Sequence, residues 1–137
     1  SNVCAAAFQA KVACFEIVSR NQVWSRDLST ALPLAVDVRN VYVVDDKGAV
    51  HALDKTSGAS VWKQDKLLYR KLTAPMAIPG FVVVGDGFGY LHVLSAEDGS
   101  LVGRLATDGS PVLAMVPVTG GAAVVQTAKG AVALVRF

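Results

Sequence analysis

The chain repeats a pattern of short apolar runs about every 40 residues. Trp62 follows Trp24 by 38 residues, and Gly99 follows Gly58 by 41. The runs are rich in valine, alanine and leucine and are separated by glycine- and aspartate-rich turns, and no run has the period of a helix. A repeat of this length made of β-type runs is typical of one four-stranded blade of a β-propeller. The period therefore favours an all-β protein built from stacked blades.

Four such repeats cover the chain as a single domain. Proline stands at the start of the run that we interpret as the innermost strand, where a missing N–H costs no ladder hydrogen bond. The first repeat lacks this innermost run, and the last stops before its outermost one. We therefore predict a partial β-propeller of about 3.5 four-stranded antiparallel blades, with blades at approximately residues 3–30, 31–66, 72–108 and 110–137.

Composition excludes several other classes of protein. Hydrophobic residues make up 53% of the 137 residues and charged residues only 18%, which is too apolar for a disordered chain. The net charge is +2 without a basic cluster, so we expect no nucleic-acid partner. No stretch approaches the roughly 18 uninterrupted apolar residues of a membrane helix.

The two cysteines, Cys4 and Cys14, are too few for a disulfide framework. A hairpin turn at Gln9-Ala10 would place Phe8 opposite Lys11 and Ala5 opposite Cys14. Cys4 and Cys14 would then project to opposite faces of the sheet. We expect both to be buried apolar residues without a bridge between them.

The stretch from residue 52 to residue 62 has the clearest local chemistry. Asp54 can accept hydrogen bonds from the backbone amides of the turn that follows it, and Gly58 can adopt the positive φ that closes this turn. Trp62 offers a wide apolar ring for burial against a neighbouring sheet. Together with Ala52 these residues resemble the tryptophan-docking motif of quinoprotein-type (PQQ-like) propeller repeats, in which each tryptophan is a wedge between blades. The resemblance makes Ala52, Asp54, Gly58, Trp62 and Trp24 structural blade-docking residues.

Two segments depart from the repeat. Gly103 occupies the position that matches Trp62, so the third blade lacks its wedge. Residues 65–72 form a longer, amphipathic link that carries Tyr69 and Arg70, residue types that are favoured at protein contacts. Two interpretations stay open: a partner surface at Tyr69 and Arg70, or a connector that covers the core between blades.

No pattern in the chain predicts catalysis, a cofactor site or a metal site. His51 and His92 occupy equivalent positions in successive repeats, but no cysteine or carboxylate shares that pattern on the same strand, so we expect packing or surface roles. The aspartates of the glycine turns lack the spacing of a calcium loop. The three glycines of residues 85–89 open no helix, which argues against a phosphate cradle.

Longer stretches resemble the BamB family of propeller lipoproteins. Residues 67–75 followed by 84–92 are the most specific, and residues 23–27 and the ending at 130–137 also fit. The resemblance implies an eight-bladed ring in the periplasm, anchored to the outer membrane by a lipid on a cysteine that is absent from this chain. It also implies a non-enzymatic scaffold of the outer-membrane β-barrel assembly complex. Its partners would be the POTRA domains of BamA and unfolded outer-membrane proteins.

Two further expectations concern the missing part of the ring. The alternative function is that of a fragment of a PQQ-dependent dehydrogenase-like propeller. That enzyme class needs acidic and amide metal ligands at the ring centre, and the inner-strand candidates offer no such cluster. The open blade edges favour self-association, in which two copies pair edge to edge and complete a ring.

Overall fold

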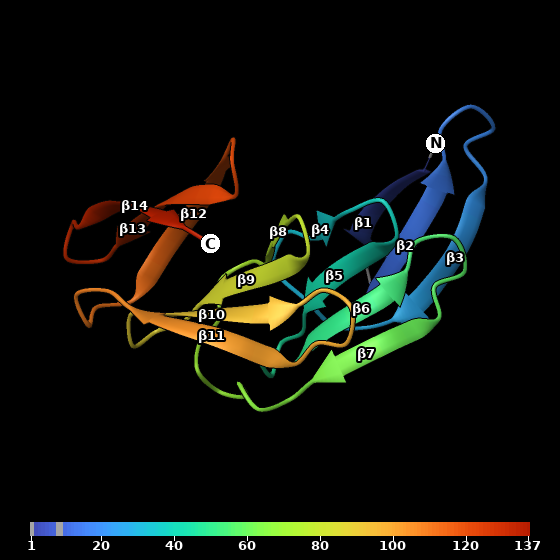
Figure 1. Cartoon of the computed structure of the whole chain (residues 1–137). Helices are drawn as coiled ribbons and strands as arrows, with labels where there is room; N and C mark the ends of the chain where they lie inside the picture. The colour runs from blue at the N-terminus through green and yellow to red at the C-terminus, as the bar shows by residue number, and fades with distance from the viewer. Residues whose placement is uncertain (1, 8–9) are drawn as a thin grey trace.

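Four antiparallel sheets follow one another along the chain (Figure 1). The structure, a computed structural model, describes residues 2–7 and 10–137, and this part of the chain contains strands and turns without a helix. The first sheet contains β1 (Asn2–Ala7), β2 (Lys11–Glu16) and β3 (Gln22–Asp27). The second contains β4 (Ala35–Val36), β5 (Asn40–Val44), β6 (Val50–Asp54) and β7 (Ser60–Gln64). The third contains β8 (Met76–Ile78), β9 (Phe81–Gly85), β10 (Tyr90–Ser95) and β11 (Leu101–Ala106), and the fourth contains β12 (Val112–Val118), β13 (Ala122–Thr127) and β14 (Val132–Arg136).

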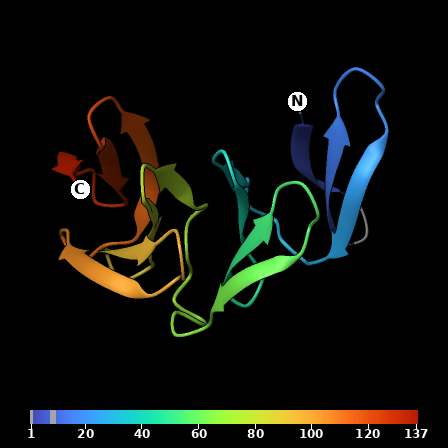
Figure 2. The same cartoon turned by 45° about the vertical axis from the view of Figure 1, so that its right-hand side comes forward.

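The sheets lie along an open arc, and the first and last sheets do not meet (Figure 2). The two middle sheets have four strands each, whereas the two end sheets have three. The predicted all-β, partial propeller is therefore confirmed. No helix in the described residues is long and apolar enough to cross a membrane.

Apolar side chains fill the spaces between neighbouring sheets. One cluster joins the first and second sheets, another the second and third, and the last the third and fourth. Every residue of β5 is buried, as are four of the five residues of β9. Burial on both faces explains why these strands read as continuous apolar runs and not as alternating ones. Proline directly precedes β8 and β12, at positions where no ladder bond is lost.

The prediction for the two cysteines was wrong. Ala7 lies opposite Lys11, and this register places Cys4 directly opposite Cys14, with which it forms a disulfide. A shift of one residue in a hairpin exchanges the faces of all its side chains, so the expected separation of the cysteines became a juxtaposition. Cys14 is buried as expected, and Cys4 is half-buried. The expected turn and the expected pairing of Phe8 involve residues 8 and 9, which lie outside the described residues.

Candidate partner surface on the third blade

Trp24 docks on the turn of the following blade. Its indole lies over Gly58, where a Cβ atom would come within 2.6 Å of the ring carbons, and Gly58 also has a φ of +76°. The indole Nε1–H donates to the carbonyl of Lys55 at 2.8 Å, and Arg26 donates to the carbonyl of Gly58 at 2.7 Å. A side chain at residue 58 would therefore displace the wedge.

Trp62 repeats this arrangement one blade later. A Cβ on Gly99 would lie 2.4 Å from the Trp62 ring, and the indole Nε1–H donates to the carbonyl of Ala96 at 3.0 Å. Ala52 is buried directly opposite Trp62 in the register of β6 and β7. The residues of the docking motif thus serve two interfaces, because Gly58 receives the preceding tryptophan while Trp62 extends to the next blade.

Asp54 shapes the turn that receives Trp24. Its Oδ1 accepts hydrogen bonds from the backbone amides of Thr56 at 2.8 Å and Ser57 at 3.0 Å and from the Thr56 hydroxyl. These hydrogen bonds, with that from the Thr56 hydroxyl the largest, lower the pKa of Asp54. The carboxylate therefore holds the turn in the shape on which the indole rests.

In the third blade, Gly103 stands at the position equivalent to Trp62, so no aromatic ring lies there. A Cβ there would meet only Val93, at 3.6 Å. A hollow of about 450 Å³ borders this part of β11, with Phe81, Phe137 and Arg136 on its other sides. The wedge between the third and fourth blades is therefore absent, as the sequence indicates.

The link that carries Tyr69 and Arg70 passes over two hairpin turns. The amide of Tyr69 donates to the carbonyl of Lys47 at 3.0 Å, and the carbonyl of Arg70 accepts from the amide of Gly87 at 2.8 Å. Tyr69 and Lys71 both have a positive φ, at 60° and 56°. The link is thus a connector between the second and third blades, and the Tyr69 side chain on it is 75% exposed.

Arg70 is fixed by a buried carboxylate. Its Nε–H donates to Oδ2 of Asp86 at 2.8 Å, and Nε2 of His92 lies 2.8 Å from the same oxygen. The other oxygen accepts from the amides of Phe88 at 2.8 Å and Tyr90 at 2.9 Å. Burial raises the pKa of Asp86, but the hydrogen bonds from His92, from these two amides and from Arg70 together outweigh it and lower that pKa. Asp86 is therefore a fully hydrogen-bonded carboxylate that sets the direction of the Arg70 side chain.

Two arginines stack on the aromatic side chains beside this turn. The guanidinium carbon of Arg70 lies 5.2 Å from the centroid of the Phe88 ring and 5.9 Å from that of Tyr90. The guanidinium carbon of Arg104, on β11, lies 4.7 Å from the Tyr90 centroid. We call Arg70, Phe88, Tyr90 and Arg104 the aromatic–arginine cluster. Phe88 is 56% exposed, so the cluster is part of the molecular surface.

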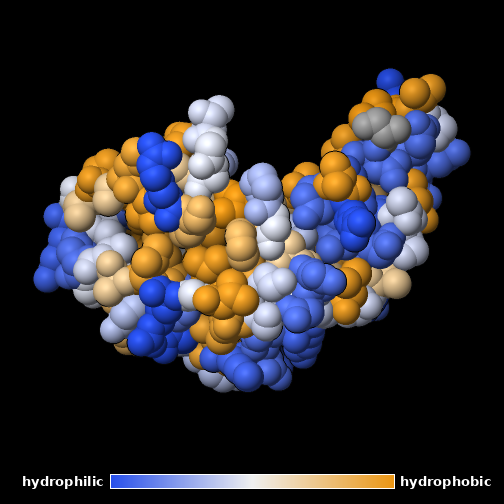
Figure 3. Space-filling view, viewed as in Figure 1, coloured by the Kyte–Doolittle hydropathy of each residue, from blue (hydrophilic) through white to orange (hydrophobic). Residues whose placement is uncertain are grey.

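A groove of about 480 Å³ runs beside this cluster, between the connector and β11. Lys66, Arg70 and Arg104 supply its charge, and the remaining lining consists of Leu67, His92 and residues 101–103. Figure 3 shows the molecule from the side of Figure 1, with apolar residues gathered mainly over the third and fourth sheets and hydrophilic residues more frequent along the lower edge and over the second sheet. Unlike that apolar surface, the groove carries charge, and its charged lining residues are all cationic.

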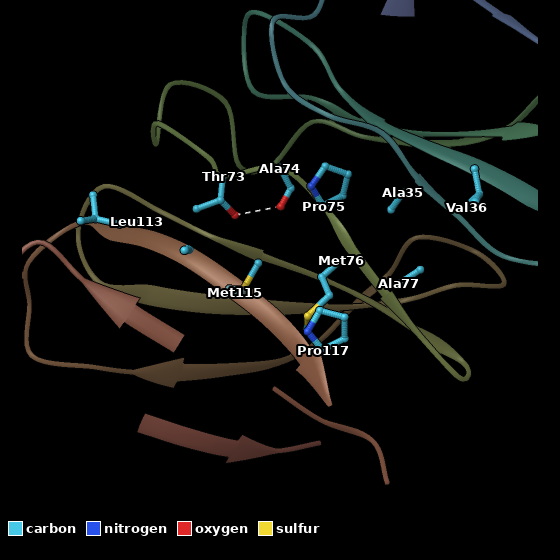
Figure 4. A pocket seen from close by; sticks show the side chains of 11 residues that line it. Ala35, Val36, Thr73, Ala74, Pro75, Met76, Ala77, Leu113, Met115 and Pro117 are labelled. Carbon is cyan, nitrogen blue, oxygen red and sulfur yellow. Dashed lines mark hydrogen bonds between the residues drawn. The ribbon is translucent and has the colours of Figure 1, made fainter. Parts of the chain in front are cut away.

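The innermost strands line a separate pocket of about 390 Å³ (Figure 4). Its walls come from the β4, β8 and β12 regions and are small or apolar, with Met76, Met115 and Pro117 among them. The hydroxyl of Thr73 donates to the carbonyl of Ala74 at 3.0 Å. The lining contains no carboxylate or side-chain amide, which are the ligands that a quinone-bound calcium would require.

The two histidines remain in separate hairpins. His51 bonds Asp45 at 2.8 Å, as His92 bonds Asp86 one blade later. Asp45 also accepts from the amides of Lys47 and Ala49. These aspartates therefore cap turns. Within the described residues, no three histidine, cysteine or acidic side chains come together as metal ligands.

Sequence reasoning proposed Arg70, together with Tyr69, which lies outside the cluster, but it missed Phe88, Tyr90 and Arg104. Phe88 and Tyr90 stand on either side of Gly89, in a segment that we used for the family resemblance and as a test for a phosphate cradle, but not as a contact surface. Arg104 directly follows Gly103, and we interpreted this segment only through the missing tryptophan. The signal was available, because residues that pair across β10 and β11, such as His92 and Arg104, share one face of the sheet.

Comparisons with known proteins give consistent results. The family model described as "Outer membrane protein assembly factor BamB" matches residues 1–64. The protein of that name from Bordetella pertussis is 37% identical over 135 residues, which are 98% of this chain and 35% of the relative. The crystal structure of BamB from Moraxella catarrhalis has a TM-score of 0.91 at 26% identity and covers 99% of this chain and 40% of that one.

A more distant similarity links the fold to an enzyme. The quinohemoprotein alcohol dehydrogenase from Comamonas testosteroni has a TM-score of 0.63 at 25% identity, over 76% of this chain and 19% of that one. The chain spans about a third of the length of the curated relatives that it matches. The activity and partners of a whole protein therefore do not follow from this part alone.

Proposed function

The chain belongs to the BamB family of outer membrane protein assembly factors and spans about a third of the length of its relatives. We propose that it forms part of a non-enzymatic scaffold in that assembly. The single observation that carries this proposal is similarity along nearly the whole chain, in sequence and in fold, to proteins with that name. In the proposed role, the blades form a rigid wall that holds partners on its surface.

The partners that we propose are the POTRA domains of BamA and unfolded outer-membrane proteins on their way to the complex. We propose a periplasmic location, with a lipid anchor supplied by the full-length protein. The disulfide between Cys4 and Cys14 supports this location, since disulfides persist in oxidising compartments such as the periplasm. The tryptophan wedges support a scaffold role, because they fix each blade against the next.

A titration of the full-length protein with the POTRA domains of BamA from the same organism tests the proposal. Isothermal titration calorimetry should show a saturable, stoichiometric complex. The absence of binding between the two folded proteins would contradict it.

A parallel titration with pyrroloquinoline quinone and calcium, followed by absorbance, tests the alternative dehydrogenase function. We expect no bound quinone, because the inner pocket offers apolar walls and no acidic or amide ligand.

A further inference from the structure

We propose that the groove between the connector of residues 65–72 and β11 binds an acidic segment of a partner protein through Arg70 and Arg104. This inference deepens the proposed function and rests on it, because it assigns to the scaffold one contact and the chemistry of its partner. The contact would be a pair of salt bridges between the two guanidinium groups and carboxylates of the segment.

The first argument is that both guanidinium groups are held in place while their donors stay free. Arg70 uses its Nε–H for Asp86, and no other hydrogen bond from this side chain is formed within the described residues. Arg104 rests on the Tyr90 ring and donates no hydrogen bond to any described residue. A planar guanidinium that is fixed by stacking retains paired N–H groups whose geometry matches a carboxylate.

The second argument is the charge of the groove. Lys66, Arg70 and Arg104 all line it, and no free carboxylate does. Asp86 compensates part of this charge, but it is fully buried and already accepts from four groups. Lys66 and Arg104 have no salt-bridge partner among the described residues, so they raise the local positive potential and favour an anionic partner.

The third argument is that the arrangement is particular to the third blade. The second blade repeats the aspartate and the histidine, as Asp45 and His51, but no arginine among the described residues bonds Asp45. Lys63 lies opposite His51 there, just as Arg104 lies opposite His92. The hairpin needs only the carboxylate and the histidine, so the two stacked arginines add a recognition surface that the turn does not require.

The fourth argument concerns the shape of the site. Leu101 and Val102 of β11 are exposed at the border of the groove, and Phe88 lies exposed beside Arg70. Exposed apolar side chains around paired arginines are typical of protein interfaces. A protein segment with carboxylates among apolar residues therefore fits this site better than a free inorganic anion.

The test uses the full-length protein and a fluorescein-labelled peptide of alternating glutamate and leucine, with the glutamine version as its counterpart. Fluorescence anisotropy should show that the acidic peptide binds, that high salt weakens this binding, and that the glutamine peptide does not bind. We expect Arg104→Gln to weaken binding of the acidic peptide about tenfold. The matched control is Lys63→Gln, at the equivalent position of the second blade, which should leave the affinity unchanged. Circular dichroism should show that both variants keep the native fold, with a small fall in melting temperature for Arg104→Gln from the lost stacking on Tyr90.

The inference would be overturned by failure of the acidic peptide to bind, by equal binding of both peptides, or by equal effects of Arg104→Gln and Lys63→Gln. It would also be overturned by Arg104-dependent binding of phosphatidylglycerol vesicles without binding of the acidic peptide. The last result would assign the groove to a lipid surface. The same variants are titrated with the POTRA domains. If the unaltered protein does not bind the POTRA domains, the proposed function is contradicted. If it binds the POTRA domains but not the acidic peptide, only the inference is contradicted.

Discussion

At the scale of single residues, the blades are joined by tryptophans that lie on glycines. Trp24 and Trp62 each occupy the space that a side chain at Gly58 or Gly99 would need, and each donates its indole N–H to a carbonyl of the receiving turn. Apolar burial and one directed hydrogen bond thus act at the same contact. The stability of an interface between blades therefore depends on a residue that has no side chain.

Substitution of Gly58 by alanine should show this dependence. Gly58 and Gly109 both have a positive φ, at +76° and +84°. Alanine at either site must therefore adopt a left-handed conformation, which lowers the free energy of unfolding by about 1 kcal/mol. Only at residue 58 does the new Cβ collide with an indole, and overpacking of this kind costs roughly a further 1–3 kcal/mol. Urea unfolding of the full-length protein measures both. Equal losses for Gly58→Ala and Gly109→Ala would contradict the wedge.

Asp86 should make the fold sensitive to acid. Its hydrogen bonds overcome burial and place its folded pKa below the ordinary value of 3.8, so the stability that it contributes is present above pH 3.8 and disappears as the pH falls further, through the folded pKa. Asp86→Asn should reduce the slope of unfolding free energy against pH in this acid range. Asp46→Asn is the control, since the Asp46 side chain makes no hydrogen bond within the described residues. An unchanged slope in Asp86→Asn would contradict the assignment.

Tyr42 should make the fold sensitive to alkali. Burial and a hydrogen bond to Asp37 raise the pKa of Tyr42 to about 12. The neutral phenol therefore contributes stability that is complete below pH 10 and is lost as the pH rises from 10 to about 12. Tyr42→Phe should unfold with a weaker dependence on pH in this window, at a loss of roughly 1 kcal/mol at neutral pH for the hydrogen bond. Unfolding curves between pH 8 and 12 that match the unaltered protein would disagree with this assignment.

At the scale of strands and sheets, register decides what each strand contributes. The sequence periodicity located the runs that became strands, because apolar runs and glycine turns are local signals. It misplaced the first hairpin by one residue, because the pairing of β1 with β2 depends on the length of a loop that no local signal specifies. A disulfide, which needs two side chains on one face, was missed for the same reason.

The disulfide should stabilise the hairpin of β1 and β2. Cys4 and Cys14 are 10 residues apart, and closing a loop of about this length in the unfolded chain is worth roughly 2–3 kcal/mol. Replacement of both cysteines by serine should therefore increase hydrogen exchange of the β1 and β2 amides in the full-length protein, and exchange in β9 and β10 should change little. Equal protection of β1 and β2 before and after the replacement would show that the bridge has no such role.

At the scale of the whole molecule, an open arc leaves apolar surface at both ends. Val3 in the first sheet and Val132 and Leu134 in the last are exposed. In a closed ring every blade lies between two others, so these residues would be covered. The sequence predicted the partial propeller that the structure shows, and the comparisons confirm the resemblance to the BamB family. The candidate site was found only in part, because the cluster of Arg70 and Arg104 forms through strand pairing and stacking between residues far apart in the sequence.

Residues 1–137 alone should therefore self-associate. Exposed apolar strands at the ends of a sheet array favour pairing between copies. Sedimentation velocity at increasing concentration should show dimers or larger species of the isolated segment, whereas the full-length protein should show fewer. A well-folded, strictly monomeric segment at all concentrations would oppose the proposal that the open ends pair.

A crystal structure of the full-length protein bound to the POTRA domains of BamA, grown with pyrroloquinoline quinone and calcium present, tests the central claim most directly. We predict a propeller in which these four sheets are consecutive blades, with Trp24 on Gly58 and Trp62 on Gly99, the POTRA domains on the outer surface, and no quinone in the channel. A quinone held by the inner strands, or a surface without the POTRA domains, would contradict the account of this chain as part of a scaffold.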